Sequence, residues 1–143
     1  MKVEQISVFL ENKAGRLFEV TGILYEAQVN IRALALADTS DFGVLRLIVD
    51  KNDRAVTALK ENGFTVGKTE VVAVKIEDKP GGLHNILKHL KETNLNVEYM
   101  YSYMRRIGQN AVMIFRFDDV PAATQLLLEK GFSIVDGSEL DTG

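Results

Sequence analysis

The chain alternates between two hydrophobic periods, that of a β-strand and that of an α-helix. Apolar and polar side chains alternate over residues 5–10, which predicts a strand with one buried face. From Leu17 to Ala27 apolar residues recur at spacings of three and four, which predicts an amphipathic helix. Further strands are expected over 30–37, 44–49 and 64–66, with a turn over 38–43 and a second helix before Gly63.

The second half of the chain repeats this order of elements. Strands are predicted over 72–76, 98–104 and 111–117, and helices from Leu83 to Leu90 and after Pro121. The repeat is sharpest at one segment, because Glu11–Leu17 is matched position for position by Glu77–Leu83 (77 − 11 = 66). Each copy follows a predicted strand and precedes a predicted helix, so it is expected to form a strand-to-helix turn. We call these segments the first turn and the second turn.

These patterns predict an α+β fold made of two ferredoxin-like βαββαβ units. Each unit is expected to be a four-stranded antiparallel sheet with two helices on one face. The predicted domains are residues 1–69 and 70–136, followed by a polar C-terminal tail over 137–143. A unit of about 70 residues buries a modest share of its surface and is marginally stable alone. We therefore expect the halves to share an interface and the chain to form a homodimer.

Composition narrows the classes of function. Among the 143 residues 46% are apolar and 26% charged, with a net charge of −3, so a nucleic-acid partner is not expected. There is no cysteine, which excludes thiol chemistry and disulfides. No apolar run approaches the roughly 20 residues of a membrane span, and the N-terminus lacks a signal-like apolar segment, so we expect a cytoplasmic protein. No nucleophile elbow, phosphate-binding loop or metal-ligand pattern occurs, so we expect no enzyme, cofactor or metal.

The two turns carry the chemistry best suited to a small ligand. A glycine before a helix lets the backbone approach a ligand, and the first helical N–H groups have no internal partner. Those amides, near Gly15 and Gly81, also lie at the positive end of the helix dipole and favour a carboxylate. Asn12 can accept from an ammonium group or donate to a carboxylate, whereas an ionised Asp78 can only accept. A simple capping or turn role remains an alternative, and it is compatible with binding.

The order of elements, the Asx-Lys-small-Gly-x-Leu turn and the x-Asn-Ile/Val opening of the second strand resemble the ACT domain, in both halves. The resemblance covers residues 1–136 and implies a free-standing tandem ACT protein without a catalytic domain. ACT domains are regulatory modules that bind amino acids or similar small ligands between paired domains, so a regulated enzyme or transcription factor is implied. Ala14 departs from the proline that Pro80 keeps, which suggests that the two sites are unequal. The implied ligand-binding residues are Asn12, Ala14, Gly15, Arg16, Leu17, Asn30, Asp78, Gly81, Gly82, Leu83 and Asn96.

Two other functions are compatible with the predicted fold. RNA-recognition modules share this order of elements, and Tyr99, Tyr101 and Tyr103 on one strand face give that hypothesis its support. An acylphosphatase-type enzyme would need an arginine-lined phosphate loop after the first strand, for which Arg16 is the one candidate. His84 lies close enough to Gly82 to touch a ligand in the second turn, although an ordinary exposed or half-buried helix role is the favoured interpretation.

Overall fold

The computed structural model describes residues 3–38 and 41–142, and they form two compact units. The N-terminal unit comprises residues 4–69, and the C-terminal unit comprises residues 70–142 together with Val3. Thr39 and Ser40 of the predicted turn, and Gly143 of the predicted tail, lie outside the described residues. Seven strands and five helices are found in the described part of the chain, which confirms the α+β fold class.

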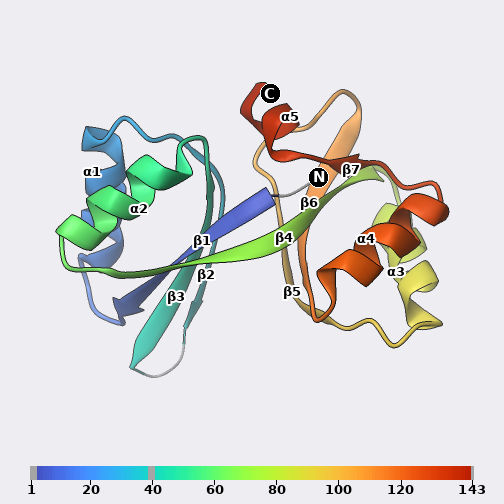
Figure 1. The fold of residues 1–143 in the computed structure, drawn as a ribbon, viewed down its shortest axis with the longest axis horizontal. Helices are drawn as coiled ribbons and strands as arrows, with labels where there is room; N and C mark the ends of the chain where they lie inside the picture. The colour runs from blue at the N-terminus through green and yellow to red at the C-terminus, as the bar shows by residue number, and fades with distance from the viewer. Residues whose placement is uncertain (1–2, 39–40, 143) are drawn as a thin grey trace. The chain divides into compact units, whose positions relative to one another are not determined.

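The N-terminal unit has the predicted βαββαβ order (Figure 1). Its elements are β1 (Val3–Glu11), α1 (Arg16–Glu26), β2 (Ile31–Asp38), β3 (Phe42–Val49), α2 (Asn52–Glu61) and the first part of β4 (Thr65–Glu77). The strand order is β2-β3-β1-β4, with β3 pairing antiparallel to both β1 and β2. Both helices cover one face of this sheet (Figure 1), and β2 is an edge strand because it stands at the end of the strand order.

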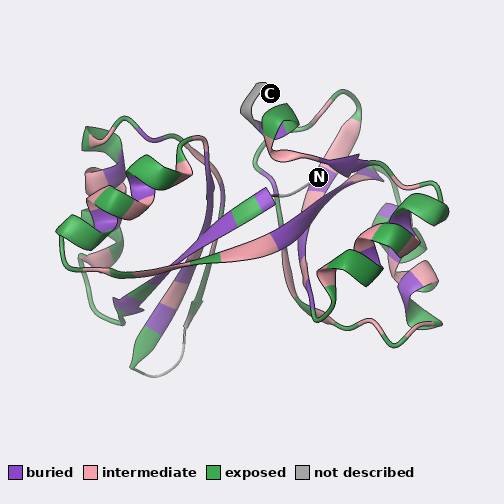
Figure 2. Ribbon diagram, in the orientation of Figure 1, coloured by how far each residue is buried: buried purple, intermediate pink, exposed green. Residues whose placement is uncertain are grey.

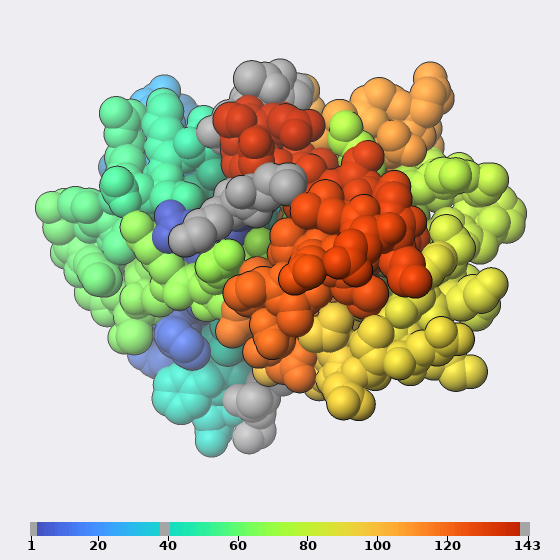
Figure 3. Space-filling view, turned by 45° about the vertical axis from the view of Figure 1, so that its right-hand side comes forward, coloured from blue at the N-terminus to red at the C-terminus, as the bar shows by residue number. Residues whose placement is uncertain are grey.

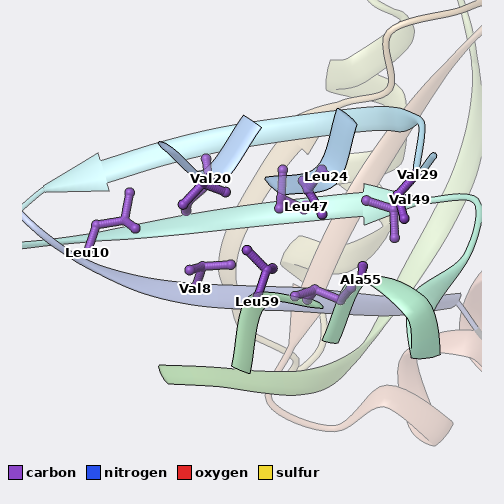
Figure 4. Close-up of a cluster of buried hydrophobic side chains, with 11 residues drawn as sticks. Val8, Leu10, Val20, Leu24, Val29, Leu47, Val49, Ala55 and Leu59 are labelled. Atoms are coloured by element: carbon purple, nitrogen blue, oxygen red, sulfur yellow. The ribbon is translucent and has the colours of Figure 1, made fainter. Parts of the chain in front are cut away.

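One cluster of buried apolar side chains fills the space between the sheet and the two helices of the N-terminal unit (Figure 4). Figure 2 shows buried positions recurring along the strands and on the inner sides of the helices. The alternation predicted for residues 5–10 is responsible, because it directs every second side chain of β1 toward the helices. The cluster comprises Ile6, Val8, Leu10, Val20, Leu24, Val29, Leu45, Leu47, Val49, Ala55 and Leu59.

The C-terminal unit repeats this arrangement with its own core. After the second part of β4 it comprises α3 (Gly82–Lys91), β5 (Val97–Ser102), β6 (Asn110–Phe117), α4 (Val120–Glu129), β7 (Ile134–Val135) and α5 (Gly137–Thr142). The strand order is β7-β4-β6-β5, with antiparallel neighbours throughout. The core contains a stacked pair, Phe115 and Phe117, with ring centroids 5.5 Å apart. The outer surfaces of α3 (yellow) and α4 (orange-red) can be followed in Figure 3.

Strand β4 differs from the sequence-based prediction. The apolar runs at 64–66 and 72–76 were expected to be two strands, but Thr65–Glu77 is one continuous strand of 13 residues. The intervening residues supply β-favouring threonine and valine and no turn sequence beyond a single glycine, so nothing interrupts the extended backbone.

A matched pair of hydrogen bonds closes each unit where its second strand begins. The Asn30 N–H donates to Asp50 Oδ1 at 2.9 Å, and the Asp50 N–H donates to the Asn30 carbonyl at 3.2 Å. In the second unit Asn96 and Asp118 make the same two bonds, at 3.0 and 3.2 Å. The repeat seen in the sequence is therefore also a repeat of local hydrogen bonding, and these asparagines are used through their backbone groups.

The C-terminal segment forms a short helix, α5, rather than the polar tail expected from its composition. The Asp136 carboxylate accepts from the Ser138 hydroxyl at 2.5 Å and from the Glu139 N–H at 3.1 Å, which caps the helix. The Tyr103 hydroxyl donates to the Leu140 carbonyl at 2.9 Å, and the Leu140 side chain is only 2% exposed. One buried leucine among polar neighbours thus anchors the segment.

Candidate functional site

Both turns place a left-handed glycine directly before a helix. Gly15 has φ 88° and Gly81 has φ 86°, and each occupies the N-cap position of the helix that follows. No side chain caps either helix, so neither Asn12 nor Asp78 has the capping role that was an alternative for them. The first helical N–H groups, those of Arg16 and Gly82, donate to the Lys13 and Lys79 carbonyls at 3.4 and 3.0 Å. The N–H groups of the next helical residues have no partner within the helix and are the ones left for a ligand at each turn.

The first turn opens into a cavity on the side that faces β2. This cavity, which we call the Asn12 pocket, has a volume of about 260 Å³. It is lined by Leu10, Glu11, Asn12, Lys13, Arg16, Leu17, Leu36 and Gly43. The turn is fixed by the Asn12 N–H, which donates to the Asp41 carbonyl at 3.0 Å. None of the described residues forms a hydrogen bond with the Asn12 side chain, so its amide is available within the pocket.

The walls of the Asn12 pocket include exposed apolar groups. Leu17 of α1 is 39% exposed and Leu36 of the edge strand β2 is 54% exposed. An apolar side chain left open to water gains free energy when a ligand or a partner covers it, by about 25 cal/mol for each Å² of apolar surface removed from water. The pocket therefore combines a polar end at Asn12 with an apolar wall.

In the second turn, the residue equivalent to Asn12 is Asp78, and its side chain already has a partner. Asp78 forms an ion pair with Arg106, which comes from the hairpin between β5 and β6. Next to it, Lys79 Nζ and Glu77 Oε2 form an ion pair at 2.6 Å. Asp78 therefore already has a cationic partner within its own unit, whereas Asn12 at the equivalent position has none among the described residues.

Each turn also borders a cavity on the side of the loop that leads into the last strand of its unit. In the N-terminal unit this is the Asn62 pocket, of about 330 Å³, lined by Phe9, Glu11, Arg16, Glu19, Phe42, Asn62, Gly63, Phe64 and Thr65. In the C-terminal unit it is the Lys130 pocket, of about 430 Å³. The two pockets occupy equivalent places, because Gly131 and Phe132 of the Lys130 pocket correspond to Gly63 and Phe64.

The two cavities differ at one position of the turn, which is Arg16 in the first unit and Gly82 in the second. Arg16 donates to both carboxylate oxygens of Glu19, at 2.9 and 3.1 Å, and approaches Glu11 at 3.5 Å. Its counterpart Gly82 has no side chain, and a Cβ built there would lie 2.0 Å from the Glu77 carbonyl oxygen. The second turn is therefore packed too tightly for any side chain at this position.

The structure gathers most of the predicted site residues, but not all of them. Those of the first turn (Asn12, Ala14, Gly15, Arg16 and Leu17) and those of the second (Asp78, Gly81, Gly82 and Leu83) lie together at their respective turns. Asn30 and Asn96, which the family resemblance assigns to the ligand of a neighbouring domain, do not lie at the turn of their own unit. Glu11 pairs with Phe42 at the start of β3, whereas Ile31 pairs with Val49 at its end, so Asn30 lies at the opposite end of the sheet. The same register places Asn96 away from the second turn.

His89, and not His84, borders the cavity beside the second turn, in keeping with the helix-surface role favoured for His84. His84 is exposed and does not line the cavity, whereas His89, half-buried, does. His89 Nδ1 lies 2.8 Å from the Asn85 carbonyl, and its ring meets Phe132 edge-on, with centroids 5.4 Å apart. The signal was present in the spacing, because residues 82, 85 and 89 lie on one face of a helix.

No group of three or more histidine, cysteine, aspartate or glutamate side chains is placed to hold a metal ion in the described part of the chain. Within the same residues, no helix has the length and apolar character needed to cross a bilayer.

Comparison with known proteins identifies relatives over the whole chain. A family model described as an ACT domain pair matches residues 1–142. The crystal structure of protein BT0572 from Bacteroides thetaiotaomicron is similar at 38% identity and a TM-score of 0.92, covering 100% of this chain and 98% of that one. The ligand-free regulatory subunit of aspartate kinase from Thermus thermophilus matches at 15% identity and a TM-score of 0.63, over 92% and 94% of the two chains. No curated protein sequence matches.

Proposed function

The chain belongs to the ACT domain family as a pair of ACT domains, and from this premise we propose that it is a regulatory protein that binds a free amino acid or a similar small ligand at its first turn. The Asn12 pocket carries the proposal. It brings together the first turn of α1, whose N–H groups after Arg16 have no partner within the helix, an amide side chain without a partner among the described residues, and an exposed apolar wall.

Each part of an amino acid has a matching group in the Asn12 pocket. The N–H groups of the first turn of α1 that follow Arg16 suit the α-carboxylate because they can donate hydrogen bonds at the positive end of the helix. The Asn12 carboxamide can accept a hydrogen bond from the α-ammonium group. Leu17 and Leu36 are placed to contact an apolar ligand side chain.

The second turn is a weaker candidate for the same ligand. Its Asp78 accepts hydrogen bonds only, would repel a carboxylate, and is already engaged by Arg106. We therefore propose unequal turns, with the ligand at the first. A homodimer would offer further polar groups, because Asn30 stands exposed at the start of an edge strand and cannot reach the turn of its own unit.

Binding of this kind would regulate a separate protein. A ligand shifts a conformational equilibrium only by the difference in its affinity for the two states. The exposed Leu36 on edge strand β2 belongs both to the pocket and to a surface that a partner can cover. We propose that ligand binding changes how this edge contacts its partner, which is an enzyme or a transcription factor.

The two alternative functions lose their main support. The RNA-binding hypothesis depends on exposed strand tyrosines, but Tyr101 is 9% and Tyr103 is 6% exposed, so neither is free to stack on a base, and Tyr99 is half-buried. The acylphosphatase hypothesis depends on Arg16, whose guanidinium is engaged by Glu19 and Glu11 rather than open to a phosphate.

A thermal-shift panel of the twenty amino acids tests the proposal. A ligand that binds only the folded protein stabilises it by RT ln(1 + [L]/Kd), so at least one amino acid should raise the melting temperature in a concentration-dependent way. The Asn12→Ala variant should lose that response, whereas Asp78→Ala, the matched change at the second turn, should keep it. An equal response in wild type and Asn12→Ala, or no response to any amino acid, would overturn the proposal.

A further inference from the structure

The Lys130 pocket concentrates positive charge. Its lining includes three lysines, Lys75, Lys79 and Lys130, against one acidic residue, Glu77, which gives a local balance of 3 − 1 = +2. The whole chain has a net charge of −3, so this cavity departs from the overall character of the protein. Like charges gathered in a concave surface raise the local concentration of oppositely charged ligands.

The positive charge of the Lys130 pocket is incompletely balanced by the chain itself. Lys79 is paired closely with Glu77, at 2.6 Å, whereas the contact of Lys75 with Glu139 is longer, at 3.8 Å, near the outer limit of an ion pair. Among the described residues Lys130 has no ion-pair partner, and the side-chain amides of Asn85 and Asn110 have no hydrogen-bond partner. One full charge and two amide groups are therefore available to a ligand.

The duplicated fold provides an internal comparison. At the equivalent Asn62 pocket the charged lining residues are Arg16, Glu11 and Glu19, a balance of 1 − 2 = −1, and the arginine is held by both glutamates. The position of Lys130 is taken there by Asn62. Because the same backbone arrangement carries opposite charge in the other unit, the cationic lining is not a requirement of the fold.

The backbone of the Lys130 pocket permits a close approach. Gly81 and Gly131 both have positive φ, of 86° and 85°, and no atom lies within 4 Å of where their Cβ would be. His89 is held in place by the Asn85 carbonyl and by its edge-on contact with Phe132, which gives the cavity a fixed aromatic side. A volume of about 430 Å³ lies within the range of cavities that bind small metabolites, which is roughly 300–1,000 Å³.

From this arrangement we propose that the Lys130 pocket binds a small dianion, a phosphate ester or a dicarboxylate, at a second site separate from the Asn12 pocket. Lys130 supplies an unpaired charge to one anionic group, and Asn85 and Asn110 donate hydrogen bonds to its oxygens. The two sites lie in different units, so the chain would respond to two chemically different ligands, a zwitterion and a dianion.

The test is calorimetric titration of the full chain, at slightly alkaline pH, with inorganic phosphate and separately with succinate. Glycine serves as the zwitterion control, and chloride as a monoanion control for ionic strength. At least one dianion should bind, and the probe that binds more tightly identifies the ligand as phosphoryl or dicarboxylate. Lys130→Glu should weaken that binding by at least about tenfold, because a charge-assisted contact becomes a repulsion.

Two further variants make the result specific. Lys88→Glu carries the same change of charge on the exposed face of α3, outside the lining of the pocket, and should leave dianion affinity within about twofold of wild type. Asn12→Ala should retain dianion binding, so failure of the amino-acid site is distinguishable from failure of this one. Equal weakening in Lys130→Glu and Lys88→Glu would show general electrostatic attraction only and overturn the proposal, as would the absence of binding by either dianion.

Discussion

Arg106 reaches from the hairpin between β5 and β6 to form an ion pair with Asp78 in the second turn. The first unit connects the same two places through the backbone, with the Asn12 N–H donating to the Asp41 carbonyl at 3.0 Å. Both units thus connect their hairpin to the turn before their first helix, but only in the second does the connection use the side chain at the Asx position. This difference leaves the Asn12 side chain without a partner among the described residues and the Asp78 side chain paired, so it makes the two turns chemically unequal.

The Asp78–Arg106 ion pair should matter little for stability. Both side chains are substantially exposed, at 43% and 62%, and exposed ion pairs contribute about 0.2–1 kcal/mol. Arg106→Ala should therefore lower the free energy of unfolding by less than about 1 kcal/mol. A double-mutant cycle with Asp78→Ala, measured by urea denaturation, gives the coupling energy directly. A coupling above about 2 kcal/mol would show that the pair is a structural element instead.

The glycines of the second turn should differ sharply in their tolerance of alanine. Gly81→Ala introduces a left-handed non-glycine residue into open space, at a cost of roughly 1–2 kcal/mol. Gly82→Ala places a Cβ 2.0 Å from the Glu77 carbonyl oxygen, and the backbone must move to relieve the contact. Its loss of unfolding free energy should exceed that of Gly81→Ala by at least about 1 kcal/mol.

Gly15→Ala is the control for this pair of variants, because its φ of 88° also meets open space and should reproduce the cost of Gly81→Ala. Equal destabilisation by Gly81→Ala and Gly82→Ala in denaturant titrations would contradict the packing argument.

The first turn is less tightly closed than the second at the position that follows the left-handed glycine. The distance from the Arg16 nitrogen to the Lys13 carbonyl oxygen is 3.4 Å, whereas the equivalent distance from Gly82 to Lys79 is 3.0 Å. The first turn therefore accepts the side chain of Arg16, whereas the second requires Gly82.

The sequence predicted the fold class and the turns because both depend on local patterns. A 66-residue offset (77 − 11 = 66) located Gly15 and Gly81, and both have the backbone conformation that favours glycine. The joining of two predicted strands into β4 was missed although the residues between them carry no turn sequence beyond one glycine. Helix α5 was missed for a different reason. The helix depends on the burial of Leu140 against residues distant in sequence, and no local pattern encodes that contact.

The cavities were harder to predict than the turns beside them. Lys130 and Phe132 reach the second turn from the loop that follows α4, and Lys75 reaches it from β4. Spacing along the chain does not indicate that these residues meet. Asp78 was identified correctly as a polar residue of the turn, but its ion pair with Arg106 arises from a hairpin far along the chain.

The hydrogen bond between Tyr103 and Leu140 should stabilise the C-terminal unit measurably. Both residues are buried, at 6% and 2% exposed, so losing the hydroxyl leaves a buried carbonyl without its donor. Tyr103→Phe should lower the free energy of unfolding by about 0.5–1.5 kcal/mol. Tyr25→Phe is the matched control, because Tyr25 is 77% exposed and its change should stay below about 0.5 kcal/mol. Equal effects of the two substitutions would show that the bond contributes nothing.

Helix α5 should lose stability in acid through the titration of Asp136. The Ser138 hydroxyl, and then the Glu139 N–H, donate hydrogen bonds that hold the pKa of this carboxyl below its ordinary value of 3.8. A lowered pKa means that the folded state favours the carboxylate. The stabilisation is therefore fully present above pH 3.8, and it is lost as the pH falls through the folded-state pKa.

Carbon-detected NMR of the Asp136 carboxyl should give a titration midpoint below 3.8. Ser138→Ala should raise that midpoint, because the Ser138 hydrogen bond is the larger cause of the lowered pKa. Wild type should be more stable than Asp136→Asn at neutral pH, with the difference shrinking below pH 3.8, so a difference that is constant with pH would exclude the carboxylate as the cap of α5.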